Sequence, residues 1–369
     1  MKHLLMVVIA GVVSGFISPF VSGSMVQAVR WLNETWGNAL IVAPFFGFWI
    51  IGFFSRYSSL ILGTGVDSYK DESVRIKVKD LVLKYASTVI TLGFGGSGGL
   101  VSPTLFIGKG LSEVFSRRSE RMFSIAFASG MLTFYLGTPL SAALLSVEYF
   151  EKDRVTYEDI MPALLAATIS YYHYKLMGYE PIFLQTLRIA PIESVGTREV
   201  LSAFVLAPIF GAIGMSVYFL KWVYRRWTDK LDVFRKTVLS GILVSVVGLL
   251  IDPRVLGLKV AYGPDAHYAT RFLTGKILAT VFTIESMGSS GYFTPLTTMG
   301  MNLGYAFSAL GFDQNIASVV GISALLSSML NVPIAAVVFP LELFGHGALI
   351  PAAIGSSVAY MLYKRFRLE

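Results

Sequence analysis

Residues 95–110 read GGSGGLVSPTLFIGKG, and this glycine-rich stretch lies between two apolar segments of the chain. Glycine and proline interrupt helices, and a membrane interior holds no water to satisfy the backbone groups that such an interruption frees. Irregular backbone is tolerated at that depth only where protein buries it or where it lines a cavity. If the surrounding chain spans a membrane, the stretch predicts a broken helix at a cavity.

The composition of the chain indicates a polytopic membrane protein. Of its 369 residues, 54% are hydrophobic and 14% are charged, whereas soluble domains carry about 25% charged residues. Several apolar segments approach the roughly 20 residues that a spanning helix needs, and the first reads as a membrane helix rather than a signal peptide. The segments lie at about 4–29, 38–62, 81–94, 122–150, 158–178, 199–224, 237–251, 276–287, 315–330 and 333–362.

The net charge of +7 comes from basic residues that we expect in loops between the apolar segments, among them Lys84, Lys221 and Arg225. The positive-inside rule places these segments and both termini in the cytoplasm, so no nucleic-acid partner is expected. Without cysteine the chain has no disulfide and no thiolate chemistry. Its four scattered histidines lack metal-ligand spacing. We therefore expect that the protein is not an enzyme and that it binds no cofactor and no metal.

The chain contains an internal duplication. GGLVSPTLFIGKGLSEVF at 98–115 aligns with SGYFTPLTTMGMNLGYAF at 290–307, with glycines and prolines at one constant offset. At nearly the same offset, LGTPLSAALLSVEYF pairs with LNVPIAAVVFPLELF and matches Glu148 to Glu342. RWLNETW, which begins at residue 30, pairs with KWVYRRW, which begins at residue 221.

The duplication predicts two membrane halves, at residues 1–187 and 199–369, joined by a linker at 188–198. Duplicated halves with interrupted segments at corresponding positions are typical of transporters. Their binding site lies at the interface of the repeats, near the middle of the membrane.

Three glycine-bearing breaks precede hydrophobic or helical runs, at 63–69, 98–106 and 290–296. A helix N-terminus presents unpaired N–H groups and a partial positive charge, so it binds an anion without a buried cation. Small residues also allow close helix packing, which explains any single glycine equally well. Three breaks, two of them related by the repeat, favour an anion site.

In order and spacing, the three breaks resemble the signatures of the CLC family of chloride channels and proton-coupled chloride antiporters, which read GSGIP, G(K/R)EGP and GxFxP. Here they read GTGVD (63–67), GLVSP (99–103) and GYFTP (291–295), and the third fits fully. The resemblance implies an all-α fold of two inverted-topology repeats whose broken helices meet at mid-membrane. It also implies a homodimer with one pore per subunit in the inner or plasma membrane of a prokaryote, and chloride or a similar small anion as substrate.

The resemblance implies an anion site built mainly from backbone groups. Thr64 stands where the family has an anion-binding serine, and the amides of Tyr292 and Phe293 are expected to face the anion. The full set of predicted anion-binding residues is Thr64, Gly65, Gly99, Leu100, Val101, Ser102, Gly291, Tyr292 and Phe293. Such dipoles discriminate by size and dehydration, so chloride, bromide, nitrate and fluoride all stay open.

Two departures from the family pattern bear on mechanism. Val101 replaces the gating glutamate, and Tyr149 replaces the internal proton-transfer glutamate. The chain resembles a truncated prokaryotic-type member that lacks both acids, the family's final helix with its inner-gate tyrosine, and its cytoplasmic regulatory domains. Intramembrane acids mark proton relays, so passive conduction through a channel or uniporter, without proton coupling, is the expected function.

Several alternatives stay open at this point. Glu285 is either a substitute acid for a chloride/proton antiporter or a structural acid that caps backbone amides. Tyr149 is either a hydroxyl at the inner mouth or a core aromatic. Glu148 and Glu342 are expected to bond helix starts or the partner half, and Asp67 is expected to be an N-cap residue. A third function is a non-conducting receptor or scaffold on the same fold.

Overall fold

The computed structural model describes residues 2–116, 120–150, 155–183, 189–258 and 266–366. Within these residues the chain is helical and contains no β-strand, so the all-α prediction is confirmed. The first half of the chain holds α1 (Lys2–Trp36), α2 (Ala43–Phe54), α3 (Val66–Lys70), α4 (Val78–Gly93), α5 (Val101–Ser116), α6 (Arg121–Leu136), α7 (Pro139–Phe150) and α8 (Tyr157–Leu176). The second half holds α9 (Thr197–Thr228), α10 (Val233–Leu250), α11 (Ala266–Glu285), α12 (Phe293–Ser308), α13 (Gln314–Leu330), α14 (Pro333–Phe344) and α15 (Leu349–Phe366).

Three of the described helical segments are long and apolar enough to cross a membrane, namely His3–Ile41, Thr197–Thr228 and Val233–Leu250. Shorter apolar helices accompany them, so several predicted segments are helix pairs rather than single spans. The segment at 122–150 is broken between α6 and α7 at Gly137, whose φ of 77° is left-handed and therefore suits glycine. In such a segment, the break between its two helices lies inside the molecule.

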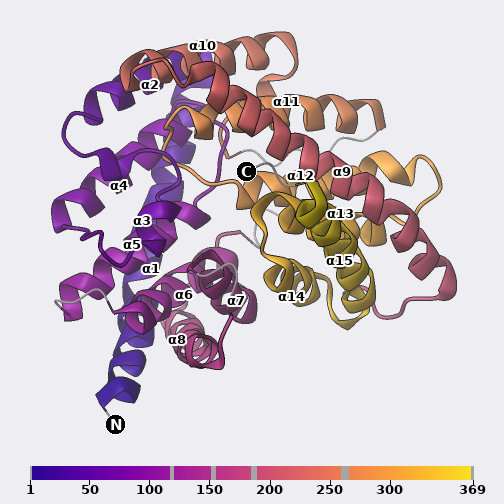
Figure 1. Cartoon of the computed structure of the whole chain (residues 1–369), viewed down its shortest axis with the longest axis horizontal. Helices are drawn as coiled ribbons and strands as arrows, with labels where there is room; N and C mark the ends of the chain where they lie inside the picture. The colour runs from indigo at the N-terminus through magenta and orange to yellow at the C-terminus, as the bar shows by residue number, and fades with distance from the viewer. Residues whose placement is uncertain (1, 117–119, 151–154, 184–188, 259–265, 367–369) are drawn as a thin grey trace.

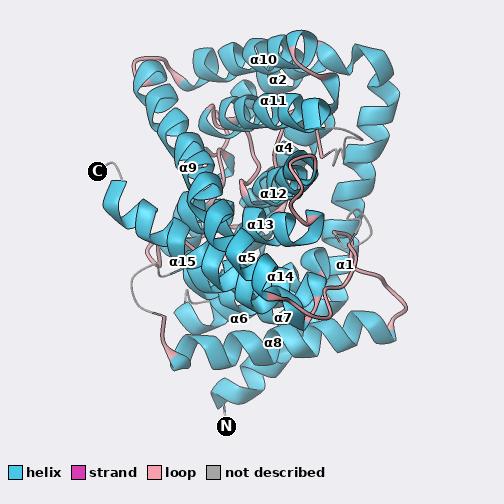
Figure 2. Ribbon diagram, turned by 90° about the vertical axis from the view of Figure 1, so that its right-hand side faces the viewer, coloured by secondary structure: helices cyan, strands magenta, loops and turns pink. Residues whose placement is uncertain are grey.

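The two halves repeat the same order of helix lengths. Each begins with a very long helix, 35 residues in α1 and 32 in α9. The helices that follow the second and third breaks, α5 and α12, have 16 residues each, and α7 and α14 have 12 each. Figure 1 shows the indigo-to-magenta half beside the orange-to-yellow half, and Figure 2 shows α1 and α9 along opposite sides of the molecule.

Hydrogen bonds between the halves come in repeat-related pairs. The amide of Ser97 donates to the hydroxyl of Thr283 at 2.9 Å, and the amide of Ser289 donates to the hydroxyl of Thr91 at 3.0 Å. Ser97 and Ser289 occupy equivalent positions in the aligned sequences, as do Thr91 and Thr283. These reciprocal bonds tie the segments before the second and third breaks to the opposite half.

The repeat-related acids Glu148 and Glu342 join the halves in the same reciprocal way. The carboxylate of Glu148, in α7, accepts bonds from the amides of Ile334 and Ala335 at the start of α14, at 2.9 and 2.7 Å. Glu342, in α14, accepts the amides at the start of α7, with 2.7 Å to that of Ser141. A carboxylate at a helix N-terminus satisfies otherwise unpaired N–H groups. The prediction that these acids bond helix starts or the partner half is confirmed, since each bonds a helix start that belongs to the other half.

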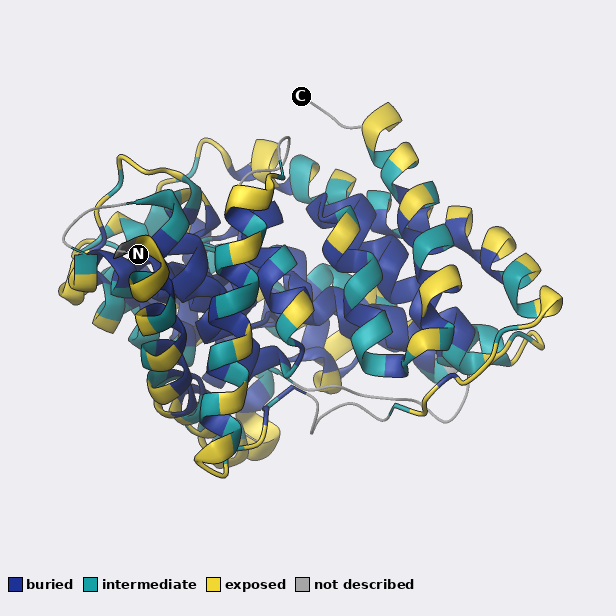
Figure 3. Cartoon of the chain, turned by 90° about the horizontal axis from the view of Figure 1, so that it is seen from below, coloured by how far each residue is buried: buried dark blue, intermediate teal, exposed yellow. Residues whose placement is uncertain are grey.

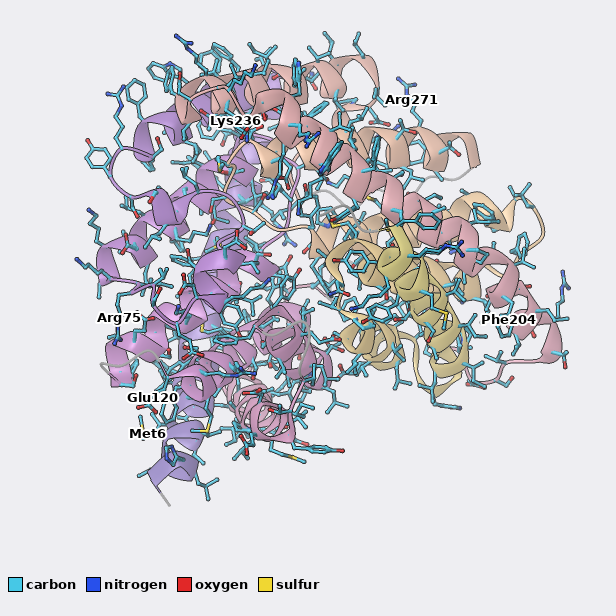
Figure 4. The ribbon with its side chains drawn as sticks, in the orientation of Figure 1. Met6, Arg75, Glu120, Phe204, Lys236 and Arg271 are labelled. Atoms are coloured by element: carbon cyan, nitrogen blue, oxygen red, sulfur yellow. The ribbon has the colours of Figure 1, made fainter. Side chains whose placement is uncertain are left out.

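The outer helices carry the apolar surface expected beside lipid. Exposed apolar side chains run along α9 and α10, and Figure 3 shows buried residues concentrated in the centre of the molecule. Phe204, 56% exposed, lies on the outer edge of α9 in Figure 4. Exposed apolar surface of this kind marks an interaction with a membrane or with another protein. The exposed set on these two helices is Leu201, Phe204, Val205, Ile209, Phe219, Val223, Trp227, Ile242, Val246, Leu249 and Leu250.

Candidate functional site

Each predicted break is followed by a helix, as expected. α3 begins at Val66, α5 at Val101 and α12 at Phe293. The prediction that Asp67 is an N-cap residue is wrong. Gly65, with a left-handed φ of 77°, holds the N-cap position of α3, and the hydroxyl of Thr64 accepts the amide of Val66 at 3.2 Å. Asp67 lies within the first turn, because the left-handed turn before it requires glycine at the cap.

The three breaks meet in space. The amide of Gly63 donates to the carbonyl of Met287 at 3.0 Å, which joins the first break to the segment before the third. The amide of Gly291 donates to the carbonyl of Gly99 at 2.8 Å, in an antiparallel bridge between the second and third breaks. A Cβ atom on Gly99 would collide with the side chain of Thr294. Glycine at this position therefore allows the two repeats to approach closely.

A cavity of about 140 Å³, here called the basic cavity, lies where the breaks meet. It brings together the predicted residues Thr64, Ser102 and Tyr292. The remaining predicted residues Gly65, Gly99, Leu100, Val101, Gly291 and Phe293 are buried but are not among its lining residues in the described part of the chain. The full lining is Thr64, Val66, Asp67, Lys70, Ser102, Tyr149, Lys221, Arg225, Glu285, Tyr292, Met329 and Leu330.

Tyr149 also lines the basic cavity, and its side chain is 4% exposed. Its hydroxyl interacts with the side chain of Ser102 but makes no hydrogen bond of standard geometry to a described residue. An unpaired buried hydroxyl costs about 1–3 kcal/mol unless a water or ligand satisfies it. This placement favours the interpretation of Tyr149 as a hydroxyl that lines the mouth of the cavity.

Glu285 lies in the wall of the same cavity, at the end of α11, with its side chain 1% exposed. Its carboxylate forms an ion pair with the guanidinium of Arg225, lies 3.9 Å from the ammonium of Lys221, and accepts the hydroxyl of Tyr292 at 2.8 Å. The structural role expected for this acid was the capping of backbone amides. Its described partners are side chains instead, because α9 brings two cations against it.

A larger cavity of about 540 Å³ continues from the basic cavity and shares Thr64, Asp67, Arg225 and Glu285 with it. Asp229 and Lys236 complete its charged lining, and Lys236, a residue of α10, is labelled in Figure 4. This cavity forms a vestibule that carries both signs of charge. A small anion reaching the basic cavity from this side would pass the cations of α9 and α10.

Several basic residues that were expected in loops lie in helices. Lys84, expected in a loop, is fully buried in α4, and its ammonium donates to the carbonyls of Ile61 and Gly63 at 3.1 and 2.8 Å. Lys221 and Arg225 belong to α9 and not to a loop. A lone lysine inside an apolar segment was the signal for Lys84, since buried charges in membrane segments usually have a function.

The buried lysine has a counterpart in the second half. Lys276, in α11, is 2% exposed, and its ammonium donates to the carbonyls of Val255 and Gly257 at 3.1 Å each. Lys84 and Lys276 are separated by the same number of residues as Gly99 and Gly291, so they are equivalent in the two halves. In each half, a buried ammonium therefore anchors one loop. In the first half, that loop carries Thr64.

A third cavity, of about 50 Å³ and here called the Arg30 cavity, lies beside the Gly99–Gly291 bridge. It is lined by Arg30 of α1, Tyr135 of α6 and Thr294 of α12, together with apolar residues. The hydroxyls of Tyr135 and Thr294 are 3.0 Å apart and hydrogen-bonded. The apolar lining consists of Val26, Ile182, Phe183 and Leu258.

Two inverted halves whose broken helices meet at polar cavities define a polytopic membrane protein with the organisation of transporters and channels. The family model described as voltage gated chloride channel matches residues 1–131 and 75–364. The chain belongs to this family, the CLC family of membrane anion channels and transporters, whose members are not enzymes.

The chain is similar to proteins of archaea and bacteria. It is 26% identical to an uncharacterised protein of Methanocaldococcus jannaschii, over 96% of this chain and 91% of the relative. It is 23% identical to the chloride/fluoride channel protein of Pseudomonas syringae pv. tomato, over 98% of this chain and 84% of the relative.

Solved structures show the same fold. A slow cyanobacterial Cl⁻/H⁺ antiporter superposes with a TM-score of 0.82 at 14% identity, over 99% of this chain and 95% of that one. A CLC-type fluoride/proton antiporter superposes with a TM-score of 0.81 at 20% identity, over 98% of this chain and 95% of that one. The prediction of a CLC-type fold with inverted repeats is confirmed.

Proposed function

We propose that the protein conducts chloride, or a similar small anion, passively across the membrane as a channel or uniporter that is not coupled to protons. Relatives and structural neighbours are named as a channel and as proton-coupled antiporters, so their names support anion transport and leave the mode of transport open.

The observation that carries the proposal is that neither the first turn of α5 nor the described lining of the Arg30 cavity holds an acidic side chain. Val101, at the gate position, is the first residue of α5 and is fully buried. Among the described residues that line the Arg30 cavity, none is acidic. Coupled exchange needs a group that titrates as the anion moves, and intramembrane acids usually serve as that group. Without one, the anion moves down its own electrochemical gradient.

The anion site itself needs no acid. The N-termini of α5 and α12, which have 16 residues each, meet at the Gly99–Gly291 bridge, and each offers unpaired N–H groups and a positive partial charge. The hydroxyls of Thr64 and Tyr149 add neutral donors from the cavity wall. Dipoles and hydroxyls bind a halide weakly enough for release, which conduction requires.

Glu285 is the main argument for the alternative, a chloride/proton antiporter with a substitute acid. Its described contacts argue against that role, because Arg225, Lys221 and Tyr292 surround the carboxylate and fix its position. A proton carrier has to exchange its proton with both sides of the membrane. Glu285 lies on one side of the crossing only, in the basic cavity and the vestibule.

We further propose that the vestibule and both termini face the cytoplasm, as the positive-inside rule predicts for the cations of α9 and α10. We also propose a homodimer with one path per subunit in a prokaryotic plasma membrane. The halves at 1–187 and 199–369 and the linker at 188–198 stay predictions, and residues 184–188 lie outside the described chain. The missing glutamates and the truncation also stay predictions from the resemblance.

Efflux from liposomes tests the proposal. Vesicles are loaded with chloride, the membrane potential is clamped with a potassium ionophore, and external chloride and pH are recorded together. Chloride release without proton movement supports passive transport. Stoichiometric proton uptake would support the antiporter, and no release of chloride would support a non-conducting scaffold.

A further inference from the structure

The Arg30 cavity combines a cation with two hydroxyls beside the crossing of the repeats. Tyr135 and Thr294 are 2% and 4% exposed, whereas Arg30 lies in an exposed part of α1. Two hydroxyls that share one hydrogen bond keep one O–H proton free to donate to a guest. The volume of about 50 Å³ exceeds the roughly 15 Å³ that one water-sized guest requires. The cavity therefore has room and donors for one small anion.

This cavity is the repeat-related counterpart of the basic cavity. Both are lined by the second residue of a helix that follows a break, Ser102 in α5 and Thr294 in α12. Three pairs of lining residues match within or directly beside the aligned segments: Arg30 with Lys221, Thr294 with Ser102, and Tyr135 with Met329. Leu258 and Thr64 form a fourth pair, because each follows a glycine whose carbonyl accepts the equivalent buried lysine. In an inverted repeat, equivalent positions face opposite sides of the membrane.

We infer that the Arg30 cavity is an anion-binding site at the opposite mouth of the same path, where Arg30 and the hydroxyls of Tyr135 and Thr294 take a single small inorganic anion. The inference deepens the proposed function and rests on it. Arg30 of α1 and Lys221 of α9 are thus repeat-related cations at opposite mouths, and Lys70 and Arg225 also line the basic cavity. Lys221 is partly neutralised by Glu285 at 3.9 Å. No acid among the described residues lines the Arg30 cavity.

The charge at Arg30 has a measurable consequence. A cation a few ångströms from a partly exposed site raises local anion occupancy, and salt screens the effect within about 10 Å at moderate ionic strength. Removal of this charge is expected to lower anion flux about fivefold at low chloride and low ionic strength. At saturating chloride the site is full in either case, so the loss is expected to shrink.

The chain has no cysteine, so a single introduced thiol reports on this site alone. Arg30→Cys is labelled in detergent with a trimethylammonium-ethyl methanethiosulfonate, which restores a positive charge, or with a sulfonato-ethyl methanethiosulfonate, which adds a negative one. Labelling is verified by mass, and the protein is then reconstituted for chloride efflux. The matched control is Asn38→Cys, an exposed residue that follows the same end of α1. Arg30→Lys retains the charge without any reagent.

We expect the positive label and Arg30→Lys to retain most of the parent flux, the unlabelled Arg30→Cys protein to lose about fivefold, and the negative label to lower flux further. The Asn38→Cys protein should respond to neither label. Equal flux for both labels at Arg30 would overturn the inference and leave the proposed function standing, since flux is present. Absence of flux from the parent protein would contradict the proposed function and, with it, the inference.

Discussion

The hydroxyl of Tyr292 donates a hydrogen bond of 2.8 Å to the carboxylate of Glu285. Tyr292 belongs to the third break and lines the basic cavity, so the acid is attached to the segment that is proposed to bind the anion. Arg225 and Lys221 of α9 contact the same carboxylate. Glu285 therefore lies in the same cavity wall as Tyr292, whose segment is proposed to bind the anion.

The substitution Glu285→Gln is expected to keep chloride flux and to raise it about threefold at low chloride, because the two cations lose their neutralising charge. The glutamine oxygen can still accept the hydroxyl of Tyr292. Efflux from liposomes measures the change. Glu113→Gln is the control, since Glu113 is also buried and ion-paired, to Lys109 at 3.8 Å, but lies outside the basic cavity. A loss of flux in Glu285→Gln alone would indicate that this acid carries protons.

Removal of the Tyr149 hydroxyl tests whether this group binds the anion or stabilises the fold. Because it makes no hydrogen bond of standard geometry to a described residue, Tyr149→Phe is expected to change the thermal midpoint little and to lower chloride flux about tenfold, the cost of one hydrogen bond to an ion. Tyr174→Phe is the matched control, because the Tyr174 hydroxyl of α8 is also buried and unpaired among the described residues but lies outside the basic cavity. Equal flux in both variants would remove Tyr149 from the anion site.

Introduction of an acid at the gate position tests the alignment of the second break. Val101 is fully buried at the start of α5, so the carboxylate of Val101→Glu should repel or replace the anion at that helix start. We expect flux to fall about tenfold at neutral pH and to recover as the pH falls, because protonation neutralises the carboxyl. Val101→Gln, of the same size, should show no pH dependence. Unchanged flux in Val101→Glu would show that residue 101 does not lie on the path.

Contact between the repeats at Gly99 predicts a steric effect. A methyl group there would collide with Thr294, so Gly99→Ala is expected to lower the free energy of unfolding by about 1–3 kcal/mol and to reduce flux. Thermal unfolding in detergent measures the first effect. Gly23→Ala in α1, whose Cβ would meet no atom within 4 Å, should be neutral or stabilising. Equal stability of the two variants would contradict the close approach at the bridge.

The sequence predicted the features that depend on local chemistry or on internal comparison. Glycine and proline mark the breaks before α3, α5 and α12 because they interrupt helices wherever they occur. The duplication was visible as an offset between two segments, and it matched Glu148 with Glu342, which the structure shows bonded to opposite helix starts. The helix-breaking residues can be recognised within a short stretch of chain, and the duplication can be recognised by alignment of the chain with itself.

The features that the sequence did not predict depend on contacts between distant helices. Nothing near Arg225 in the chain shows that it meets Glu285, which lies two helices further on. In the sequence, Arg30 was notable only as a member of a repeated heptapeptide. The fold brings it to the same cavity as Thr294. The clustering of basic residues predicted a loop position for Lys84, because such a pattern does not show that the side chain is buried in α4. Tertiary packing decides these positions.

The reversal potential across a bilayer that contains the purified protein tests the central claim most directly, with a fixed chloride gradient and an imposed pH difference. Passive conduction predicts a reversal potential equal to the equilibrium potential of chloride, unchanged when the pH difference is reversed. A reversal potential that shifts with the pH difference would show that protons move with the anion and would contradict the account.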